Sequence, residues 1–304
     1  FKTSFSFRRI INFYKTTSFI RKIIEEVQPE IIHVHQINTV AFFAILGNLR
    51  HRIPLVLNSW GSDILLNPKK GLIWKLLVRY CLKHADAITA DSIYMADTIR
   101  KLLPGKDLHI RICNWGVDEI DADFKKEKII YSNRHHKSLY RISNIIKAFR
   151  KFKDTPSGND WKLVVAGSGP ESNSLKLQVQ ELGLEPFVQF VGYLDKHKNH
   201  EFYARSMVYV SIPESDAVSI SILESMYHGC IPVVSDIPTR REWIIDGVTG
   251  VIVDDVSSNF LDLISAIDLN FAGEVNHRVV LKKGTASIAA KKYSDLHRDL
   301  IAKD

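Results

Sequence analysis

Short apolar runs alternate with longer amphipathic segments along this chain, and the alternation predicts its secondary structure. The short runs are rich in Val and Ile, which favour strands, whereas the longer segments repeat apolar residues every three or four positions, as helices do. The predicted strands are Ile31–His35, Leu55–Asn58, Ala87–Thr89, Ile110–Cys113, Ile129–Tyr131, Leu163–Ala166, Val188–Val191, Val208–Ile212 and Ile231–Ser235. The predicted helices are Ile10–Val27, Leu72–Cys81, Ile93–Leu103, Ile142–Phe149, Leu175–Leu182, Ser221–His228 and Ala286–Ala302. Strands that alternate with helices in this way indicate an α/β protein with parallel sheets.

A charged stretch near the middle of the chain separates two such series. Few apolar residues occur from Asp118 to Lys128, and the alternation of strands and helices starts again at Ile129. We therefore predict a first domain over residues 1–118, a linker over 119–128 and a second domain over 129–304. The 304 residues suffice for two domains of roughly 150 residues each.

Composition and charge narrow the class of protein. Hydrophobic residues make up 45% of the chain and charged residues 25%, which excludes a disordered or fibrous protein. No apolar run approaches the roughly 18 residues that a membrane helix needs. The three cysteines fit neither a disulfide framework nor a metal-ligand spacing, so we expect a reducing compartment. A net charge of +7 favours an anionic partner, such as a nucleotide, a phospholipid surface or a nucleic acid.

The most distinctive segment runs from Asp216 to Asp236. A strand ends near Pro213, a loop follows, and a helix is predicted to begin at about Ser221. Backbone N–H groups at a helix N-terminus bind phosphate well, and two carboxylates, those of Asp216 and Glu224, flank this point. Ser221 and Glu224 also have the spacing of a capping box, so a purely structural role for Glu224 stays open.

This segment resembles the hallmark of the retaining nucleotide-sugar glycosyltransferases of family 4, which have the GT-B fold. The match is Glu224-Ser-Met-Tyr-His-Gly-Cys-Ile-Pro-Val-Val234, with Asp216 ahead of it, and the blocks 167–171, 192–193 and 237–250 resemble further family blocks in the same order. The resemblance implies two facing Rossmann-like domains with parallel sheets. Only about 30 residues precede Ile31, fewer than several strands with crossovers need, so we expect the first domain to lack its opening strands.

The same resemblance implies a donor site in the second domain. Glu224 would accept hydrogen bonds from the donor ribose, the loop after Asp216 would face the sugar and its phosphate, and Arg134 would bind the diphosphate. A lysine is expected to help Arg134, but the aligned position holds Tyr140, so Lys137 is the candidate and a solvated surface charge is the alternative. The candidate donor-binding residues are Arg134, Lys137, Gly167, Gly169, Ala217, Val218, Ser219, Ile220 and Glu224, and the candidate catalytic residues are Asp63 and Asp216.

In the first domain, the segment 59–63 occupies the position of a family block in which a histidine precedes glycine. Trp60 stands in place of that histidine, and we expect His35, Trp60 and Gly61 on the acceptor side. Asp63 would make a polar contact in the cleft, or cap a helix. His33 and His35 share one strand face, where either a metal pair or two satisfied structural histidines would fit.

Metal and cofactor chemistry is not expected, because Arg134 and a helix N-terminus would stabilise the departing diphosphate. Asp121-Ala-Asp123 has the form of a metal-binding pair, but it lies in the predicted linker rather than after a strand. His135 and His136 are expected to be solvated.

Two basic stretches with interleaved aromatic residues, 1–22 and 69–83, would suit the surface of an anionic membrane, although solvated helix faces explain them equally well. We expect a cytoplasmic protein, peripheral on the inner face of the cell membrane if these stretches bind lipid.

The function hypothesis is retaining transfer of a sugar from a nucleotide-sugar donor to a glycan or polyprenyl-linked acceptor, in bacterial surface polysaccharide synthesis and without a nucleic-acid partner. Two alternatives stay open. One is another sugar-nucleotide enzyme, such as an epimerase or a phosphorylase. The other is a non-catalytic sugar-nucleotide-binding subunit, which the departures at Trp60 and Tyr140 keep open.

Overall fold

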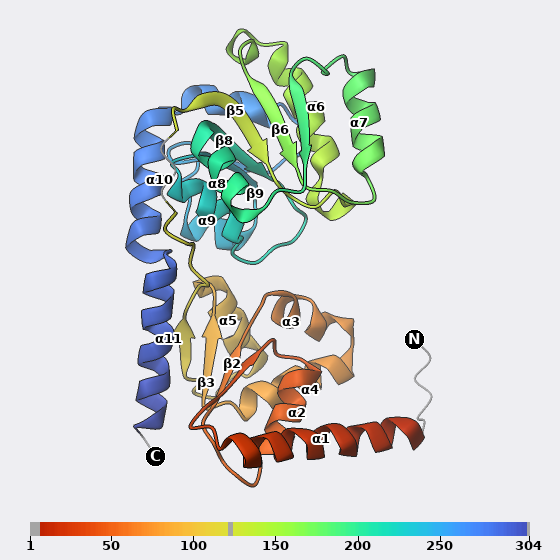
Figure 1. The fold of residues 1–304 in the computed structure, drawn as a ribbon, viewed down its shortest axis with the longest axis vertical. Coiled ribbons are helices and arrows are strands. Elements are labelled where there is room, and N and C mark those ends of the chain that lie inside the picture. The colour runs from red at the N-terminus through yellow and green to blue at the C-terminus, as the bar shows by residue number, and fades with distance from the viewer. Residues whose placement is uncertain (1–6, 121–123, 303–304) are drawn as a thin grey trace. The chain divides into compact units, whose positions relative to one another are not determined.

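The computed structural model describes residues 7–120 and 124–302, with side chains from Asn12 onward. The chain divides into two compact α/β units, which are shown in Figure 1. The first unit comprises Phe1–Asn114 and Ala290–Asp304, and the second comprises Trp115–Ala289. Within the described ranges, none of the helices combines the length and the apolar character needed to cross a membrane.

The first unit is built on a parallel sheet of four strands in the order β1-β2-β3-β4. Its strands are β1 (Ile32–His35), β2 (Leu55–Asn58), β3 (Ala87–Ala90) and β4 (Ile110–Ile112). All four lie where the apolar runs predicted them. Strands β2 and β3 are buried along their whole length, as expected for a parallel sheet that is covered on both faces.

Helices cover both faces of this sheet. The Asn38 side chain accepts a hydrogen bond from the backbone N–H of Val40 at the start of α2, and Ser92 caps α5 in the same manner. One face packs on a core that α2, α4 and α5 share, and the other packs on Leu296 and Leu300 of α11. The helices of this unit are α1 (Phe7–Val27), α2 (Thr39–Asn48), α3 (Ser62–Leu65), α4 (Leu72–Lys83), α5 (Ile93–Leu102) and the C-terminal part of α11 (Ala286–Ile301).

The second unit is built on a six-stranded parallel sheet in the order β10-β9-β8-β5-β6-β7. The first strand of the unit, β5, therefore lies between β6 and β8, and the strand order reverses between β5 and β8. In doubly wound α/β sheets, ligands bind outside the carboxyl ends of the strands at this reversal. The strands are β5 (Glu127–Ser132), β6 (Lys162–Ala166), β7 (Val188–Gly192), β8 (Ser206–Ser211), β9 (Ile231–Ser235) and β10 (Val251–Val253).

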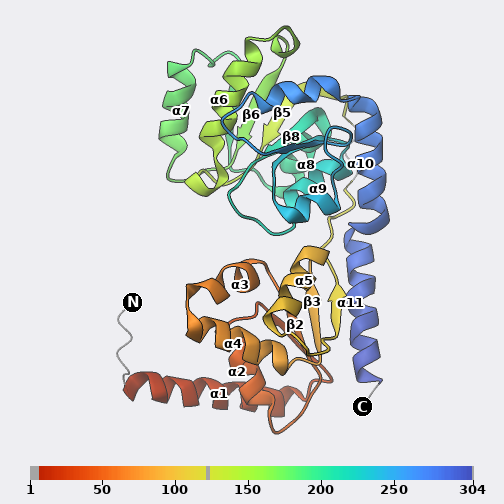
Figure 2. The ribbon, with the colours of Figure 1, turned by 180° about the vertical axis from the view of Figure 1, so that it is seen from behind.

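Alternate residues of these strands face two separate cores. Ile130 of β5 belongs to the core under α6 and α7, whereas Ile129 and Tyr131 belong to the core under α8 and α9. Helices α9 and α10 lie side by side, as the two opposite views in Figures 1 and 2 show. The helices are α6 (Ile142–Lys153), α7 (Ser172–Glu181), α8 (Lys196–Arg205), α9 (Ile220–Tyr227) and α10 (Leu269–Lys283).

The limits of the two units differ from the predicted domains 1–118 and 129–304. Val117 already belongs to the second unit, because its N–H donates to the Gly284 carbonyl and its carbonyl accepts from the Ala286 N–H, both at 2.8 Å. Strand β5 begins at Glu127, inside the predicted linker. Residues 290–304, which the prediction placed in the second domain, belong to the first unit because the apolar side chains of α11 pack on its sheet.

Candidate active site

Two loops that follow β5 and β8 meet at the reversal of the strand order in the second unit. The first loop carries Asn133 and Arg134, and the second carries Asp216 and leads into α9 at Ile220. Both loops begin at the carboxyl ends of neighbouring parallel strands, so their side chains come together although more than eighty positions separate them.

Asp216 lies between two arginines. Its Oδ2 accepts hydrogen bonds from Arg134 Nη2 at 2.9 Å and from Arg240 Nη2 at 3.0 Å. Arg240 also donates to the Ala217 carbonyl at 3.1 Å, and its side chain is only 3% exposed. Burial lowers the pKa of Arg240, and Asp216 counteracts that effect. The Asp216 carboxylate is thus held in place by a guanidinium on each side.

The guanidinium of Arg134 is directed at the N-terminus of α9. Its Nη1 donates to the hydroxyl of Ser219 at 2.7 Å and to that of Ser221 at 3.2 Å. The ring of Tyr140 lies against it, with the guanidinium carbon 4.5 Å from the ring centroid. Tyr140 therefore supports the arginine rather than supplying a second cation, and Arg134 and the helix N-terminus together favour an anion.

Glu224 lies one helical turn further along α9 and does not form the capping box that its spacing allowed. The residue that precedes the helix is Ser219, and it makes no capping hydrogen bond through its side chain. Glu224 Oε2 instead accepts a hydrogen bond from the Tyr203 hydroxyl at 3.1 Å, and its Oε1 lies 3.9 Å from Nε2 of the buried His200. Burial raises the pKa of Glu224, an effect that the Tyr203 hydrogen bond opposes.

The two predicted glycines hold the loop of Arg134. Gly167 has φ +100°, and a Cβ at this position would lie 2.7 Å from the Arg134 carbonyl oxygen. A Cβ on Gly169 would lie 2.5 Å from both the His136 carbonyl oxygen and His135 Nδ1. The N–H groups of the two glycines donate to the Gly192 carbonyl and to the Ser172 hydroxyl. Close backbone approach therefore accounts for both residues, and they position the arginine loop.

His136 is buried at 2% exposure, so the expectation that it is solvated was wrong, whereas His135 is exposed. A Cβ on Gly167 would lie 3.7 Å from His136 Nε2, and His136 Nδ1 forms a 2.8 Å hydrogen bond with the Ser172 hydroxyl. Lys137 is exposed just before a 3-10 turn over Ser138–Tyr140. The predicted loop residues Ala217, Val218 and Ile220 are partly exposed around the start of α9.

In the first unit, Asp63 is buried at 2% exposure and does not face solvent. Its carboxylate accepts hydrogen bonds from the backbone N–H groups of Ile37 at 2.8 Å, Trp60 at 3.0 Å and Ile64 at 3.1 Å. Burial raises the pKa of Asp63 in spite of these donors. The predicted polar contact in a cleft is therefore not what the structure shows, and Asp63 fixes the loops after β1 and β2.

The other predicted residues of the first unit lie where those two strands end. Trp60 is 46% exposed, and its ring centroid is 6.3 Å from that of the exposed His35. Gly61 is buried with φ +104°, a conformation that favours glycine. His33 stacks on His35 at 4.7 Å and lies 3.2 Å from His297 of α11 through its Nδ1. Burial lowers the pKa of His33 to about 4, so it is a neutral, packed histidine.

Metal ligation finds no support among residues 7–120 and 124–302, where no three His, Cys, Asp or Glu residues gather closely enough to hold an ion. Asp121 and Asp123, the pair set aside in the sequence analysis, lie outside the described residues.

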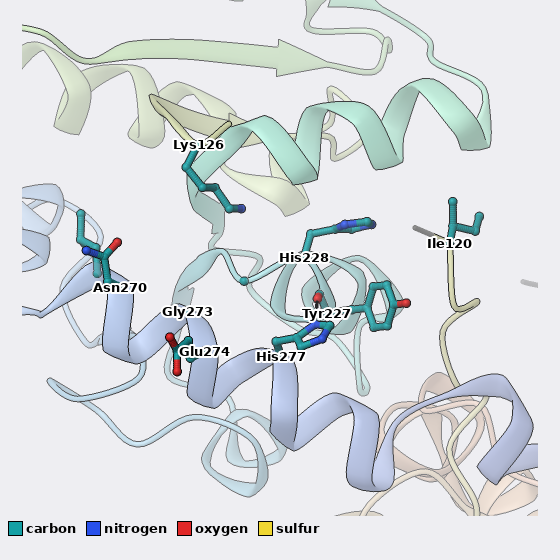
Figure 3. Close-up of a pocket in the computed structure, with 10 residues that line it drawn as sticks. Ile120, Lys126, Tyr227, His228, Asn270, Gly273, Glu274 and His277 are labelled. Atoms are coloured by element: carbon teal, nitrogen blue, oxygen red, sulfur yellow. Dashed lines mark hydrogen bonds between the residues drawn. The ribbon is translucent and has the colours of Figure 1, made fainter. Parts of the chain in front are cut away.

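A separate pocket of about 370 Å³ opens beside α10, and Figure 3 shows its lining. His228, Lys126 and His277 contribute polar groups to it, and Gly229 and Gly273 form part of its wall. His228 Nε2 lies 2.7 Å from His200 Nδ1, so this pocket borders the histidine pair behind Glu224.

The sequence analysis missed several polar residues that hold this site together. Arg240 falls within a block noted only as family-like, and the two adjacent arginines at 240 and 241 gave no sign of which is buried. Four further residues belong to no sequence motif: Asn133, Tyr203, Tyr209 and His200. A search for buried polar groups could have found some of them, because it would examine polar residues directly after a strand and tyrosines within buried elements.

Comparison with known proteins identifies the family. The model of the family "Glycosyl transferases group 1" matches residues 118–283, more than half of the chain, and that of "Glycosyl transferase 4-like" matches residues 2–92. The N-acetyl-alpha-D-glucosaminyl L-malate synthase of Bacillus anthracis is 25% identical in an alignment of 299 positions that covers 90% of this chain and 76% of that protein. The alpha-monoglucosyldiacylglycerol synthase of Streptococcus pneumoniae is 25% identical over 84% of this chain, which spans 64% of that protein.

Solved structures show the same fold. The pneumococcal O-GlcNAc transferase GtfA, determined in complex with UDP and GlcNAc, superposes with a TM-score of 0.78 at 11% identity, over 94% of this chain and 60% of that protein. The predicted GT-B fold with two parallel-sheet units is thereby confirmed. From the matched residues and the shared fold, we conclude that this chain belongs to the glycosyl transferases group 1 family of glycosyltransferases.

Proposed function

We propose that this protein is a retaining glycosyltransferase that moves a sugar from a nucleotide-sugar donor to a glycan or lipid-linked acceptor in the synthesis of a bacterial surface polysaccharide. The observation that carries the proposal is the arrangement at the reversal point of the second sheet. Arg134 is bonded to Ser219 at the N-terminus of α9, where the two would bind a diphosphate, and the Glu224 carboxylate, further along this helix, would accept from a ribose.

The chemistry needs groups that stabilise negative charge on the departing nucleoside diphosphate. Arg134 fits this role because its guanidinium is fixed by Ser219, Ser221 and the Tyr140 ring, so little reorganisation accompanies the reaction. Asp216 accepts hydrogen bonds from both Arg134 and Arg240, so Arg240 still holds Asp216 when Arg134 turns to a phosphate. Ala217 and Val218 follow it in the loop and would border the sugar.

The proposal includes a reaction without a metal ion, because Arg134 and the helix N-terminus supply the positive potential. Full activity in excess chelator is expected, and strict dependence on Mg²⁺ or Mn²⁺ would contradict it. The known relatives support the substrate classes. One is named for a glucosaminyl malate product and another for a glucosylated diacylglycerol, a lipid, and the solved neighbour holds UDP.

Calorimetry with UDP, GDP and the corresponding nucleosides tests the donor site. Arg134→Ala should weaken binding of the nucleoside diphosphate by at least about tenfold, because a charge-assisted hydrogen bond is lost, and should change nucleoside binding much less. Turnover of labelled nucleotide sugars with lipid extracts then separates a transferase from an epimerase, a phosphorylase or a non-catalytic subunit. Failure of every nucleotide to bind the folded protein would overturn the proposal.

We further propose that the first unit docks on the cytoplasmic face of the membrane through the segment 66–83. Leu72 and Ile73 at the start of α4 are 71% and 76% exposed, and no acidic residue occurs between Asp63 and Asp86. Exposed apolar side chains beside cations are what an anionic lipid surface binds. The exposed cations here are Lys69, Lys70, Lys75 and Lys83. The stretch 1–22 noted in the sequence has its first six residues outside the described part, but Tyr14 and Phe19 of α1 are also exposed.

Co-sedimentation with vesicles tests this surface. Binding should require anionic lipid, weaken as salt is added and fall in Leu72→Ser/Ile73→Ser. Ile245→Ser in the second unit is the matched control, because Ile245 is 63% exposed on a different unit and should leave binding unchanged. Equal binding to neutral and anionic vesicles, or to neither, would remove the membrane from the proposal.

A further inference from the structure

A continuous chain of hydrogen bonds connects Arg134 to Glu224 through the interior of the second unit. Arg134 Nη1 lies 3.2 Å from the Ser221 hydroxyl, which lies 2.8 Å from the Tyr209 hydroxyl. The Tyr209 hydroxyl in turn lies 2.8 Å from Oδ1 of the Asn133 side chain, and Nδ2 of the same side chain lies 2.7 Å from the Tyr203 hydroxyl. The chain ends with the 3.1 Å bond from Tyr203 to Glu224 Oε2.

The orientation of the Asn133 side-chain amide, together with the chemistry of the other members, sets the direction of every bond in this series. An amide oxygen only accepts and an amide nitrogen only donates, so Asn133 receives the single phenol proton of Tyr209 and donates to the Tyr203 oxygen. Tyr209 must then accept from Ser221, which accepts from Arg134. Tyr203, whose oxygen is already an acceptor, donates its proton to Glu224. All five bonds therefore run from the cation to the carboxylate.

The phenol hydroxyls of this hydrogen-bond chain are sealed from water, whereas Asn133 and Ser221 are half-buried. Tyr203 and Tyr209 have no exposed surface, and they come from different elements, α8 and β8. Bonds that point the same way polarise one another in a low dielectric, so the donor strength at one end depends on the charge at the other. Among the residues of this hydrogen-bond series, only Asn133 has one side-chain atom that can only accept, Oδ1, and another that can only donate, Nδ2.

We propose that Asn133 and Tyr209 are positioning residues that couple the diphosphate half of the donor site to the ribose half. This inference rests on the proposed function, in which Arg134 and Glu224 bind the two parts of one nucleotide. A phosphate that draws on the N–H groups of Arg134 weakens the donation passed to Ser221, and the last bond, from Tyr203 to Glu224, weakens with it. The Glu224 carboxylate then becomes a stronger acceptor for a ribose hydroxyl. Engagement of one half therefore favours engagement of the other.

Coupling of this kind is measured by a double-mutant cycle on UDP affinity, or on GDP affinity if UDP does not bind. The cycle pairs Arg134→Lys with Glu224→Gln and is carried out by calorimetry. In the otherwise unchanged protein, the loss of nucleotide affinity in the double variant should differ from the product of the two single-variant losses by about threefold or more. In the Tyr209→Phe background, which deletes one buried hydroxyl and touches neither end, the losses should multiply.

A third phenol supplies the matched control. Tyr131 is as buried as Tyr209 and pairs with it across β5 and β8, but its hydroxyl donates to Asn199 and lies on a side branch of the chain. Tyr131→Phe should lower stability to a similar degree and leave the non-multiplicative behaviour intact. If the buried hydroxyls had only a structural role, Tyr209→Phe and Tyr131→Phe would change the coupling between Arg134 and Glu224 to the same extent. Ser221→Ala breaks the chain at a less buried position and provides the same comparison if Tyr209→Phe does not fold.

The outcomes separate the two proposals. Nucleotide binding with multiplicative losses in the otherwise unchanged protein, or with the same coupling in Tyr209→Phe and Ser221→Ala, would overturn the inference and leave the donor site standing. No binding of either nucleotide to the folded protein would overturn the donor site and the inference together. Coupling that disappears in Tyr209→Phe and persists in Tyr131→Phe is the expected result.

Discussion

Removing the charge of Asp216 should lower the stability of the protein much more than removing that of Arg240, its partner in a buried ion pair. Arg240 is 3% exposed and its two hydrogen bonds go to Asp216 and to the Ala217 carbonyl, at 3.0 and 3.1 Å. Asp216→Asn leaves this buried cation, and Arg134 beside it, without an anion. Removing one partner of a buried ion pair costs about 3–5 kcal/mol, because the other charge remains desolvated.

The reverse change is expected to cost less. Arg240→Met removes the cation together with its burial penalty, and the Asp216 carboxylate keeps Arg134 at 2.9 Å. The loss is then that of a hydrogen bond to a charged group, about 1.5–3 kcal/mol. Adding Arg240→Met to Asp216→Asn should therefore restore part of the lost stability, since no unpaired cation is left in the interior.

Urea unfolding followed by circular dichroism and tryptophan fluorescence measures these differences, provided that the slopes of the transitions agree. Arg241→Met is the control, because Arg241 is the sequence neighbour of Arg240 but pairs with Asp236 at the surface and should leave the midpoint unchanged. Equal losses for the two single variants, or a double variant less stable than Asp216→Asn, would refute the asymmetry.

Three further predictions follow from the site. Glu224→Gln should weaken nucleotide binding about tenfold or more but keep or raise the melting temperature at pH 7, because burial raises the pKa of Glu224 and its charge therefore costs stability above that pKa; a lower melting temperature would contradict this. Burial, and then His200, lowers the pKa of His228 from 6.5 to about 3, so the unfolded chain gains this proton first and stability should fall as pH drops below 6.5; His228→Gln should flatten that part of the melting profile, and an unchanged profile would argue against it. Gly167→Ala should reduce both nucleotide affinity and stability, since its Cβ would press on the Arg134 carbonyl, whereas Gly183→Ala, also at positive φ but in open space, should affect stability alone; equal affinity losses would show that the contact is unimportant.

The fold was largely accessible from the sequence because buried parallel strands leave a strong local signal. The nine apolar runs correspond to nine of the ten strands in residues 7–120 and 124–302. The strand missed, Val251–Val253, has three residues next to a turn, too few to stand out from a loop. Helix α8 was not predicted individually because its sequence, from Lys196 to Arg205, is mostly polar, and only three of its residues are buried.

The site was accessible only in part, because sequence patterns identify residues but not their partners. The loop, the helix and two carboxylates led to a proposed anion site at α9, and the structure places Arg134 in contact with Ser219 and Ser221 there. The role of Asp63 did not follow, since nothing local indicates that its carboxylate accepts from the distant Ile37 N–H. Buried tyrosines likewise resemble ordinary core residues until the direction of their hydroxyl groups is known.

The final helix has a consequence for the order in which the protein can assemble. Helix α11 begins in the second unit, yet its Leu296 and Leu300 complete the core over Val56 and Ala87 of the first, and Asp299 pairs with Arg111 at 2.8 Å. A ribosome makes these residues after the whole second unit. The core of the first unit is therefore completed only after the second unit has been synthesised, although the first unit is made earlier. Until then, one face of its sheet lacks the helix that covers it, which lies some two hundred residues further along the chain.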